Sequence, residues 1–241
     1  IIEQTYNDGI TKFVCAGYNI PSSKFSLELA QKYNYIYSIV GISPNDIPQT
    51  EEELWKSIEE ISNIAVENRN KKIVAIGEIG LDYYWNTENK ELQKKAFIKQ
   101  IELANKLELP IVIHSRDAFI DTIDIIKNHK VNKAGIFHCC QQNQELVKQA
   151  LQLGYYISFA GPITFKNSKN ASAIIDMVPL EKMLIETDSP YLSPEPNRGQ
   201  RNDCRNVKYV AQKIADLKGN SLEEVAKKTY ENAMKIFEIE K

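Results

Sequence analysis

Four short apolar runs in the sequence each end on a side chain that can bind a metal ion. The runs KIVAIGE, LPIVIH, AGIFH and EKMLIETD end at Glu78, His114, His138 and Asp188. Neutral imidazoles and ionised carboxylates suit Zn²⁺ and Mn²⁺, and Mg²⁺ takes carboxylates together with water. One or two such ions can activate a water molecule and stabilise the charge that develops on a phosphoryl or acyl oxygen. We therefore predict a hydrolytic centre that holds one or two divalent ions, Mg²⁺, Mn²⁺ or Zn²⁺.

The elements that must position these side chains alternate regularly along the chain. Each run is rich in Ile, Val, Leu or Phe and is followed by a loop and a helical pattern, which is typical of a buried strand that leads into a helix. In barrels of alternating strands and helices, the loops after the strand C-termini build the active site. The pattern predicts seven such strands, near residues 10–17, 36–42, 72–78, 110–114, 134–138, 155–160 and 183–188.

The strand count and the chain length together predict the fold class. A chain of 241 residues without an internal linker favours one α/β domain over residues 1–241, of the length that a (β/α)-barrel needs. A closed barrel of this class has eight strands. The opening IIEQTYNDG reads as the end of a helix that closes at Gly9. We therefore expect a TIM-type (β/α)8 barrel whose first strand, with most of a helix, precedes Ile1 and is missing from this sequence.

Charge and cysteine usage restrict the functional classes. The net charge of −2 argues against a generally basic surface that coats nucleic acid, but it allows a local basic patch or phosphate binding through a metal. The four cysteines contain no C-x-x-C pair and form no disulfide framework, which favours the reducing cytoplasm. No apolar run approaches the 18 residues of a membrane span, so we expect no membrane association.

Taken one at a time, the candidate metal ligands have ordinary structural interpretations. A lone histidine at a strand end is usually a hydrogen-bonded structural residue, and Glu78 alone could pair with an arginine. The common position of all four side chains at strand ends favours the metal interpretation over these. Glu186, two residues before Asp188, is predicted to orient the site rather than to bind the ion.

Four basic residues are candidates for binding a substrate anion. Arg116 is expected in the first turn of a helix, where the helix dipole disfavours cations, so holding an anion would explain its position. The other three lie in loops where barrels of this class often bind phosphate, and a solvated loop charge is an equally good interpretation of each. These three residues are Lys166, Arg198 and Arg201. The aromatic residues 83–85 could stack on a base or simply pack at the rim.

Five segments together closely resemble the TatD family of metal-dependent deoxyribonucleases, within the amidohydrolase-like barrel superfamily. They are GEIGLDYY, IHSRDA, the FHC of IFHCC, YYISFAGPITFKN and ETDSPYLSPEPNRGQRN, and the resemblance runs from about Gly9 to Phe237. It implies that Glu78, His114 and His138 bind metal, and that Asp188 is a ligand or a base. Glu78 and Asp188 would be the catalytic residues. The implied activity is 3′–5′ exodeoxyribonuclease cleavage of DNA phosphodiesters by a metal-activated water, with DNA 3′ ends or single strands as the partner.

The sequence departs from the family pattern at three places. The family's first strand carries an H-x-H pair of further ligands, which is absent here, in agreement with the expectation that a segment precedes Ile1. Ser43 stands where the family usually has His in a G-x-H-P segment, which puts one substrate contact in doubt. Residues 140–142, CQQ, replace the usual F-S-G after FHC, so the loop beyond His138 is expected to differ.

Two other functions are compatible with the same residues. The first is a different hydrolase on the same metal centre, which cleaves an ester such as that of a D-aminoacyl-tRNA. The second is a metal-free barrel that has lost catalysis and binds nucleic acid or protein. Activity on DNA ends against activity on mischarged tRNA would distinguish the two enzymes.

Overall fold

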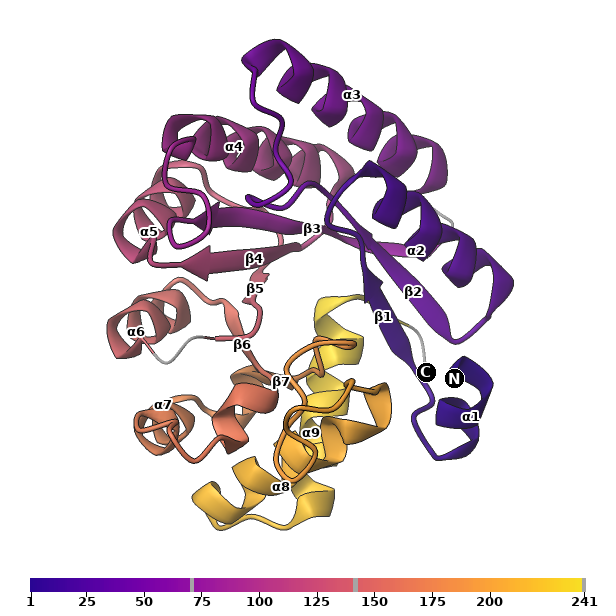
Figure 1. Ribbon diagram of the computed structural model, residues 1–241, viewed down its shortest axis with the longest axis vertical. Coiled ribbons are helices and arrows are strands. Elements are labelled where there is room, and N and C mark those ends of the chain that lie inside the picture. The colour runs from indigo at the N-terminus through magenta and orange to yellow at the C-terminus, as the bar shows by residue number, and fades with distance from the viewer. Residues whose placement is uncertain (70–71, 141–142, 240–241) are drawn as a thin grey trace. The chain divides into compact units, whose positions relative to one another are not determined.

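Seven parallel strands alternate with helices in the computed structural model, which describes residues 1–69, 72–140 and 143–239 (Figure 1). The strands of this part of the chain follow their sequence order in one sheet, β1-β2-β3-β4-β5-β6-β7. Their bounds are β1 Phe13–Ala16, β2 Ile36–Val40, β3 Ile73–Asp82, β4 Ile111–Arg116, β5 Gly135–Phe137, β6 Tyr156–Phe159 and β7 Met183–Ile185. All seven lie at or within the positions expected from the sequence, apart from the ends of β3 and β4.

The helices follow the strands as the apolar periodicity predicts. Their bounds are α1 Ile2–Asn7, α2 Ile20–Lys32, α3 Glu51–Asn68, α4 Lys90–Leu107, α5 Phe119–Asn128, α6 Gln144–Gln152, α7 Ala171–Met177, α8 Val207–Lys218 and α9 Leu222–Ile236, with a short 3₁₀ turn η1 at Gly161–Thr164. Several begin at capping residues: Thr50 accepts the Glu53 N–H before α3, and a reciprocal Ser221–Glu224 capping box begins α9. In the described ranges, no helix is both long and apolar enough to cross a membrane.

The chain divides into two compact units, which we name by their strands. The β1–β4 unit comprises residues 12–136, and the β6–β7 unit comprises residues 1–11 and 137–241. In the β1–β4 unit, α2 packs on β2, α4 packs on β3, and α3 contacts both helices. Its core contains fully buried side chains from strands and helices alike, such as Ile76, Phe97 and Ile113. A single domain over residues 1–241, with a further strand before Ile1, stays a prediction.

The β6–β7 unit is organised by its last helix. Helix α9 packs against β7 and α8, and α7 contacts α8. The buried Asn232 side chain on α9 donates to the carbonyl oxygens of Leu180, at 2.7 Å, and Met183, at 2.8 Å. These two bonds join α9 to the start of β7, and they satisfy an amide that would otherwise be costly to bury.

Three strand ends differ from the expectation. Strand β3 does not stop at Glu78 but continues to Asp82, with a register irregularity between Ile76 and Ile79 opposite β4. Arg116 is the last residue of β4 rather than part of a first helical turn, because α5 begins only at Phe119. Strand β7 ends at Ile185, so Asp188 lies in the loop beyond it.

Candidate metal centre

Glu78 and His114 face each other from neighbouring strands of the β1–β4 unit. The Nδ1 atom of His114 lies 2.9 Å from Oε1 of Glu78, and their side chains are only 16% and 20% exposed. When the imidazole is neutral and its proton is on Nε2, both of these atoms are acceptors. A positive charge, either a proton or a metal cation, must then lie between them. The pair therefore has the chemistry of two ligands of one cation.

The close approach of β3 and β4 depends on Gly80. Gly80 pairs with His114 across the two strands and has φ 134°. A Cβ atom at this position would collide with the carbonyl oxygen of His114. Only glycine combines this backbone conformation with this separation. Gly80 thus sets the position of the His114 backbone relative to β3.

The second nitrogen of His114 is held by a carboxylate that sequence reasoning missed. Nε2 of His114 lies 2.9 Å from Oδ2 of Asp82, whose side chain is fully buried. Burial raises the pKa of Asp82, but hydrogen bonds from His114, the Trp85 N–H and Asn45 outweigh it and bring the pKa to about 2. An ionised Asp82 accepts the Nε2 proton, which leaves Nδ1 as the ligand atom. Carboxylates commonly orient metal-binding histidines in this way.

His138 belongs to the β6–β7 unit and directly follows β5. Its Nδ1 lies 3.6 Å from Oε1 of Glu186, and the same oxygen accepts the backbone N–H of Cys139. The Glu186 N–H in turn donates to the carbonyl oxygen of Phe159, at 3.0 Å, beside β6. The predicted role of Glu186 in orienting the site stays a prediction.

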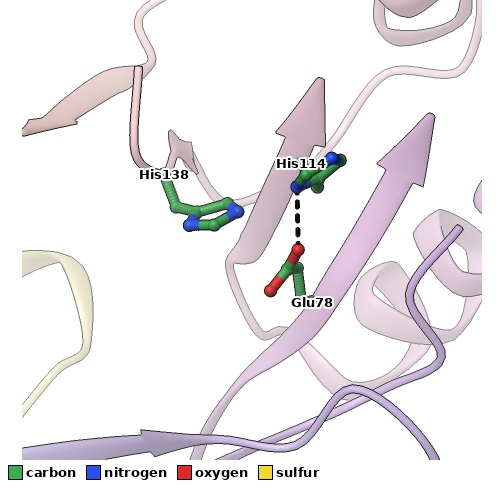
Figure 2. Close-up of side chains that lie close together, drawn as sticks. All are labelled: Glu78, His114 and His138. Atoms are coloured by element: carbon green, nitrogen blue, oxygen red, sulfur yellow. Dashed lines mark ion pairs between the residues drawn. The ribbon is translucent and has the colours of Figure 1, made fainter. Parts of the chain in front are cut away.

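Glu78, His114 and His138 offer one ligand atom each within 4.8 Å of one another, as Figure 2 shows. All three residues are partly buried. Two imidazole nitrogens and one carboxylate oxygen form a donor set that fits Zn²⁺ or Mn²⁺. The structure therefore contains a possible metal site made of these three residues, and Asp188 is not part of this group.

The remaining predicted residues of the β6–β7 unit lie in exposed loops. Asp188 is exposed, three residues after β7, with a left-handed φ of 56°. The Arg198 guanidinium lies 4.1 Å from the ring centroid of Phe165 and 4.0 Å from Oε1 of Glu195. Lys166, directly after Phe165, and Arg201 are both exposed. Their predicted roles in binding substrate stay predictions.

The loop after β2 gives Ser43 a structural role. Ser43 is buried, and its hydroxyl donates to Oδ2 of Asp46 at 2.8 Å. Asp46 also accepts the Asn19 side-chain amide at 2.8 Å, so this serine helps to join the loop to the start of α2. Of the predicted departures after His138, Gln141 and Gln142 lie outside the described residues.

Comparison with known proteins assigns the chain to a family. Residues 1–238 match the family described as "TatD related DNase". The chain belongs to the TatD family. Its TatD relatives include the uncharacterized metal-dependent hydrolase YabD of Bacillus subtilis, 40% identical over 99% of this chain and 92% of that protein. YcfH of Escherichia coli K12, also an uncharacterized metal-dependent hydrolase, is 40% identical over 76% of this chain and 68% of its own length.

Solved structures confirm the fold class of this TatD protein. YJJV, a TatD homologue from Escherichia coli K12, superposes with a TM-score of 0.91 at 26% identity, over 99% of this chain and 90% of that one. A TatD-family hydrolase from Entamoeba histolytica has the same fold, with a TM-score of 0.86 at 24% identity, over 97% and 87% of the two chains. The predicted TIM-type alternation and the predicted family are therefore confirmed. The chain is placed among the metal-dependent hydrolases of the TatD family.

Proposed function

We propose that this TatD protein is a deoxyribonuclease that hydrolyses DNA phosphodiester bonds, trimming from a 3′ end. The observation that carries the proposal is the group of Glu78, His114 and His138 with the chemistry of a cation site. The description of the matching family as a DNase family supports DNA as the substrate. The four cysteines, all within the described ranges, form no disulfide, which is consistent with action in the reducing cytoplasm, the location that we propose.

The cation would be held by Nδ1 of His114, a carboxylate oxygen of Glu78 and a ring nitrogen of His138. When bound, it would supply activation of a water and stabilisation of the charge on the phosphoryl oxygen. Asp82 accepts the Nε2 proton of His114, at 2.9 Å, and so directs Nδ1 toward the cation. We assign Glu186, whose Oε1 lies 3.6 Å from Nδ1 of His138, the role of orienting that imidazole.

The proposed role of Asp188 is to take a proton from the attacking water. An exposed carboxylate in a loop beyond a barrel strand is accessible to both water and substrate, and a carboxylate can serve as a general base. Arg116, Lys166, Arg198 and Arg201 would bind phosphates of the DNA rather than take part in the chemistry. Their guanidinium and ammonium groups donate charge-assisted hydrogen bonds to phosphate oxygens.

The test uses the purified protein, 3′-labelled single-stranded oligonucleotides and added Mg²⁺, Mn²⁺ or Zn²⁺, with a chelator as the control. We expect hydrolysis only with a cation, and its loss in His138→Ala. His129→Ala is the matched control, because His129 is the histidine at the C-terminus of α5 and belongs to no candidate site. Hydrolysis that persists in chelator would contradict the proposal. Cleavage of a D-aminoacyl-tRNA ester without cleavage of DNA would reassign the substrate and keep the metal centre.

A further inference from the structure

Two neighbouring aromatic side chains project into solvent two and three residues after the buried Asp82. Tyr84 is 52% exposed and Trp85 is 69% exposed, and their rings meet edge to face with centroids 4.8 Å apart. Exposing two large aromatic rings side by side forfeits the free energy that their burial would gain. Such a pair is therefore a candidate for contact with another molecule.

Their neighbour Tyr83 shows that the exposure is not a property of the whole loop. The Tyr83 hydroxyl donates to Oδ2 of Asp121 at 2.6 Å, and the Lys90 ammonium lies 4.4 Å from its ring centroid. Burial and this contact with Asp121 raise the pKa of Tyr83. Tyr83 thus packs into the β1–β4 unit, whereas the next two aromatic residues do not.

An arginine completes the exposed pair. The Arg116 guanidinium carbon lies 4.0 Å from the centroid of the Tyr84 ring and 5.5 Å from that of Trp85. Within the described ranges, no carboxylate forms an ion pair with Arg116, in contrast to Arg205, which binds both Asp203 and Asp8. Its N–H donors are therefore available to an external anion, while stacking on the rings fixes the plane of the guanidinium.

The arrangement is held rigidly next to the candidate metal centre. Oδ1 of Asp82 accepts the backbone N–H groups of both Tyr84 and Trp85 at 2.9 Å, while Oδ2 of the same carboxylate binds His114. Arg116 lies two residues after His114 on β4, and its carbonyl oxygen accepts the Tyr83 N–H at 2.9 Å. One buried carboxylate thus orients a ligand histidine and anchors the exposed rings.

We propose that Tyr84, Trp85 and Arg116, which we call the aromatic shelf, bind an unpaired nucleobase together with its neighbouring phosphate. An aromatic face stacks on any base, and a stacked guanidinium with free donors binds phosphate, so the combination fits a single-stranded nucleic-acid end better than a paired one. The proposal rests on the proposed function and deepens it: these three side chains form the subsite that holds the terminal nucleotide of the DNA.

Fluorescence provides a direct test of base stacking, because the chain has only two tryptophans, Trp55 and Trp85. In the Trp55→Phe background, Trp85 is the single indole reporter. A short oligothymidylate is titrated into this variant in chelator, so that no turnover is needed. We expect saturable quenching of Trp85 that is lost when the two 3′-terminal nucleotides are replaced by abasic residues. Equal quenching by both oligonucleotides, or none by either, would overturn the proposal.

Substitutions then test whether the contact matters for hydrolysis. In the cation-loaded enzyme, Trp85→Ala should raise KM for single-stranded DNA about 5- to 100-fold, the range expected for one lost base stack, with little change in kcat. Arg116→Lys keeps the charge but loses the planar stack. It should therefore raise KM for single-stranded DNA less than Arg116→Gln, which loses both. Phe25→Ala is the control, because Phe25 is an equally exposed aromatic residue, 60%, on α2. An unchanged KM in Trp85→Ala would overturn the proposal.

These measurements separate the failure of the aromatic shelf from the failure of the proposed function. Trp85 quenching by oligothymidylate without any cation-dependent DNA hydrolysis would leave the base-binding shelf standing and contradict the nuclease. Cation-dependent hydrolysis that is equally fast on blunt duplexes and on single strands, with Trp85→Ala unaffected, would leave the nuclease standing and contradict the shelf.

Discussion

The surroundings of His114 and those of Asp188 differ in how firmly the protein holds a candidate catalytic side chain. His114 is in a strand, and a carboxylate contacts each of its ring nitrogens at 2.9 Å. Asp188 lies in the loop after β7 and is exposed. The first side chain is positioned by packing of β3 against β4, the second by a loop. Changes around His114 should therefore alter both stability and cation binding, whereas the isosteric Asp188→Asn should act mainly on the chemistry.

The largest expected effect is on catalysis at Asp188. Asp188→Asn keeps the size of the side chain and its tolerance of the left-handed backbone, φ 56°, but it cannot take a proton. We expect kcat to fall about 10³-fold, the typical contribution of a general base, with an unchanged melting temperature. Steady-state kinetics measures kcat, and thermal unfolding measures the melting temperature. Loss of folding together with activity would contradict the contrast between the two regions.

Gly80→Ala should destabilise the surroundings of His114 by forcing the backbones of β3 and β4 apart. The added Cβ collides with the His114 carbonyl oxygen at a residue whose φ is 134°, so we expect the free energy of unfolding to fall by about 3 kcal/mol. Gly154→Ala is the matched control, because its φ is 87° but no atom lies within 4 Å of the added Cβ. Denaturant unfolding should show a loss of only about 1 kcal/mol there. Equal losses at both positions would mean that the approach of β3 to β4 is not tight.

Asp82→Asn should weaken cation binding without removing a ligand. The pKa of about 2 keeps the native carboxylate ionised throughout the neutral range, so it accepts the Nε2 proton of His114. An asparagine can present its amide N–H to Nε2, which moves the imidazole proton to Nδ1, the nitrogen beside Glu78. We expect the dissociation constant for Mn²⁺ or Zn²⁺ to rise about 10- to 100-fold in a calorimetric titration.

The control for this substitution is Asp121→Asn, which changes a second carboxylate that binds the same aromatic loop. Asp121 accepts the Tyr83 hydroxyl and pairs with Lys94 at 2.8 Å, but it does not contact His114. Its replacement should leave the cation affinity unchanged. A similar loss in both variants would show that disturbance of the loop, rather than the proton on His114, explains the effect.

The smallest effect is expected from the loop cations of the β6–β7 unit. Arg198→Gln should weaken binding of single-stranded DNA several-fold and reduce the salt dependence of log K by about 0.7, the value for one phosphate contact. Lys56→Gln serves as the control, because Lys56 is an exposed lysine on α3 that forms an ion pair with Glu52 of the same helix. Binding isotherms at several salt concentrations measure the slopes, and an unchanged slope for Arg198→Gln would exclude this phosphate contact.

Much of the fold can be predicted because the spacing of apolar residues differs between strands and helices. The seven strands of the described chain and the Ser221–Glu224 cap follow from local sequence. The ends of strands were predicted less well. The sequence predicts Arg116 in the first turn of a helix, yet β4 stays extended through Arg116 and α5 begins only at Phe119.

Asp82 was missed for a reason that lies in β3. The sequence pattern predicts the end of the strand at Glu78, since a charged residue after an apolar run usually marks a strand end. The register irregularity between Ile76 and Ile79 accommodates Glu78 within the strand, and the following Ile79, Gly80 and Leu81 continue it to Asp82. The sequence does contain one signal for Asp82: the apolar residues resume after Glu78 and end again at a single Asp. Its contact with His114 is set by strand register, which the sequence pattern does not determine.

The central claim is that Glu78, His114 and His138 share one cation, and a titration tests it most directly. Mn²⁺ or Zn²⁺ is titrated into the parent, Glu78→Gln, His138→Asn, the double variant and the control His129→Asn, and the dissociation constants are compared. If the ligands share one ion, each single change should weaken binding about 100-fold or more, and the double variant little further, because the losses are coupled. His129→Asn should bind like the parent. Unchanged affinity in either single variant, or fully additive losses, would contradict the claim.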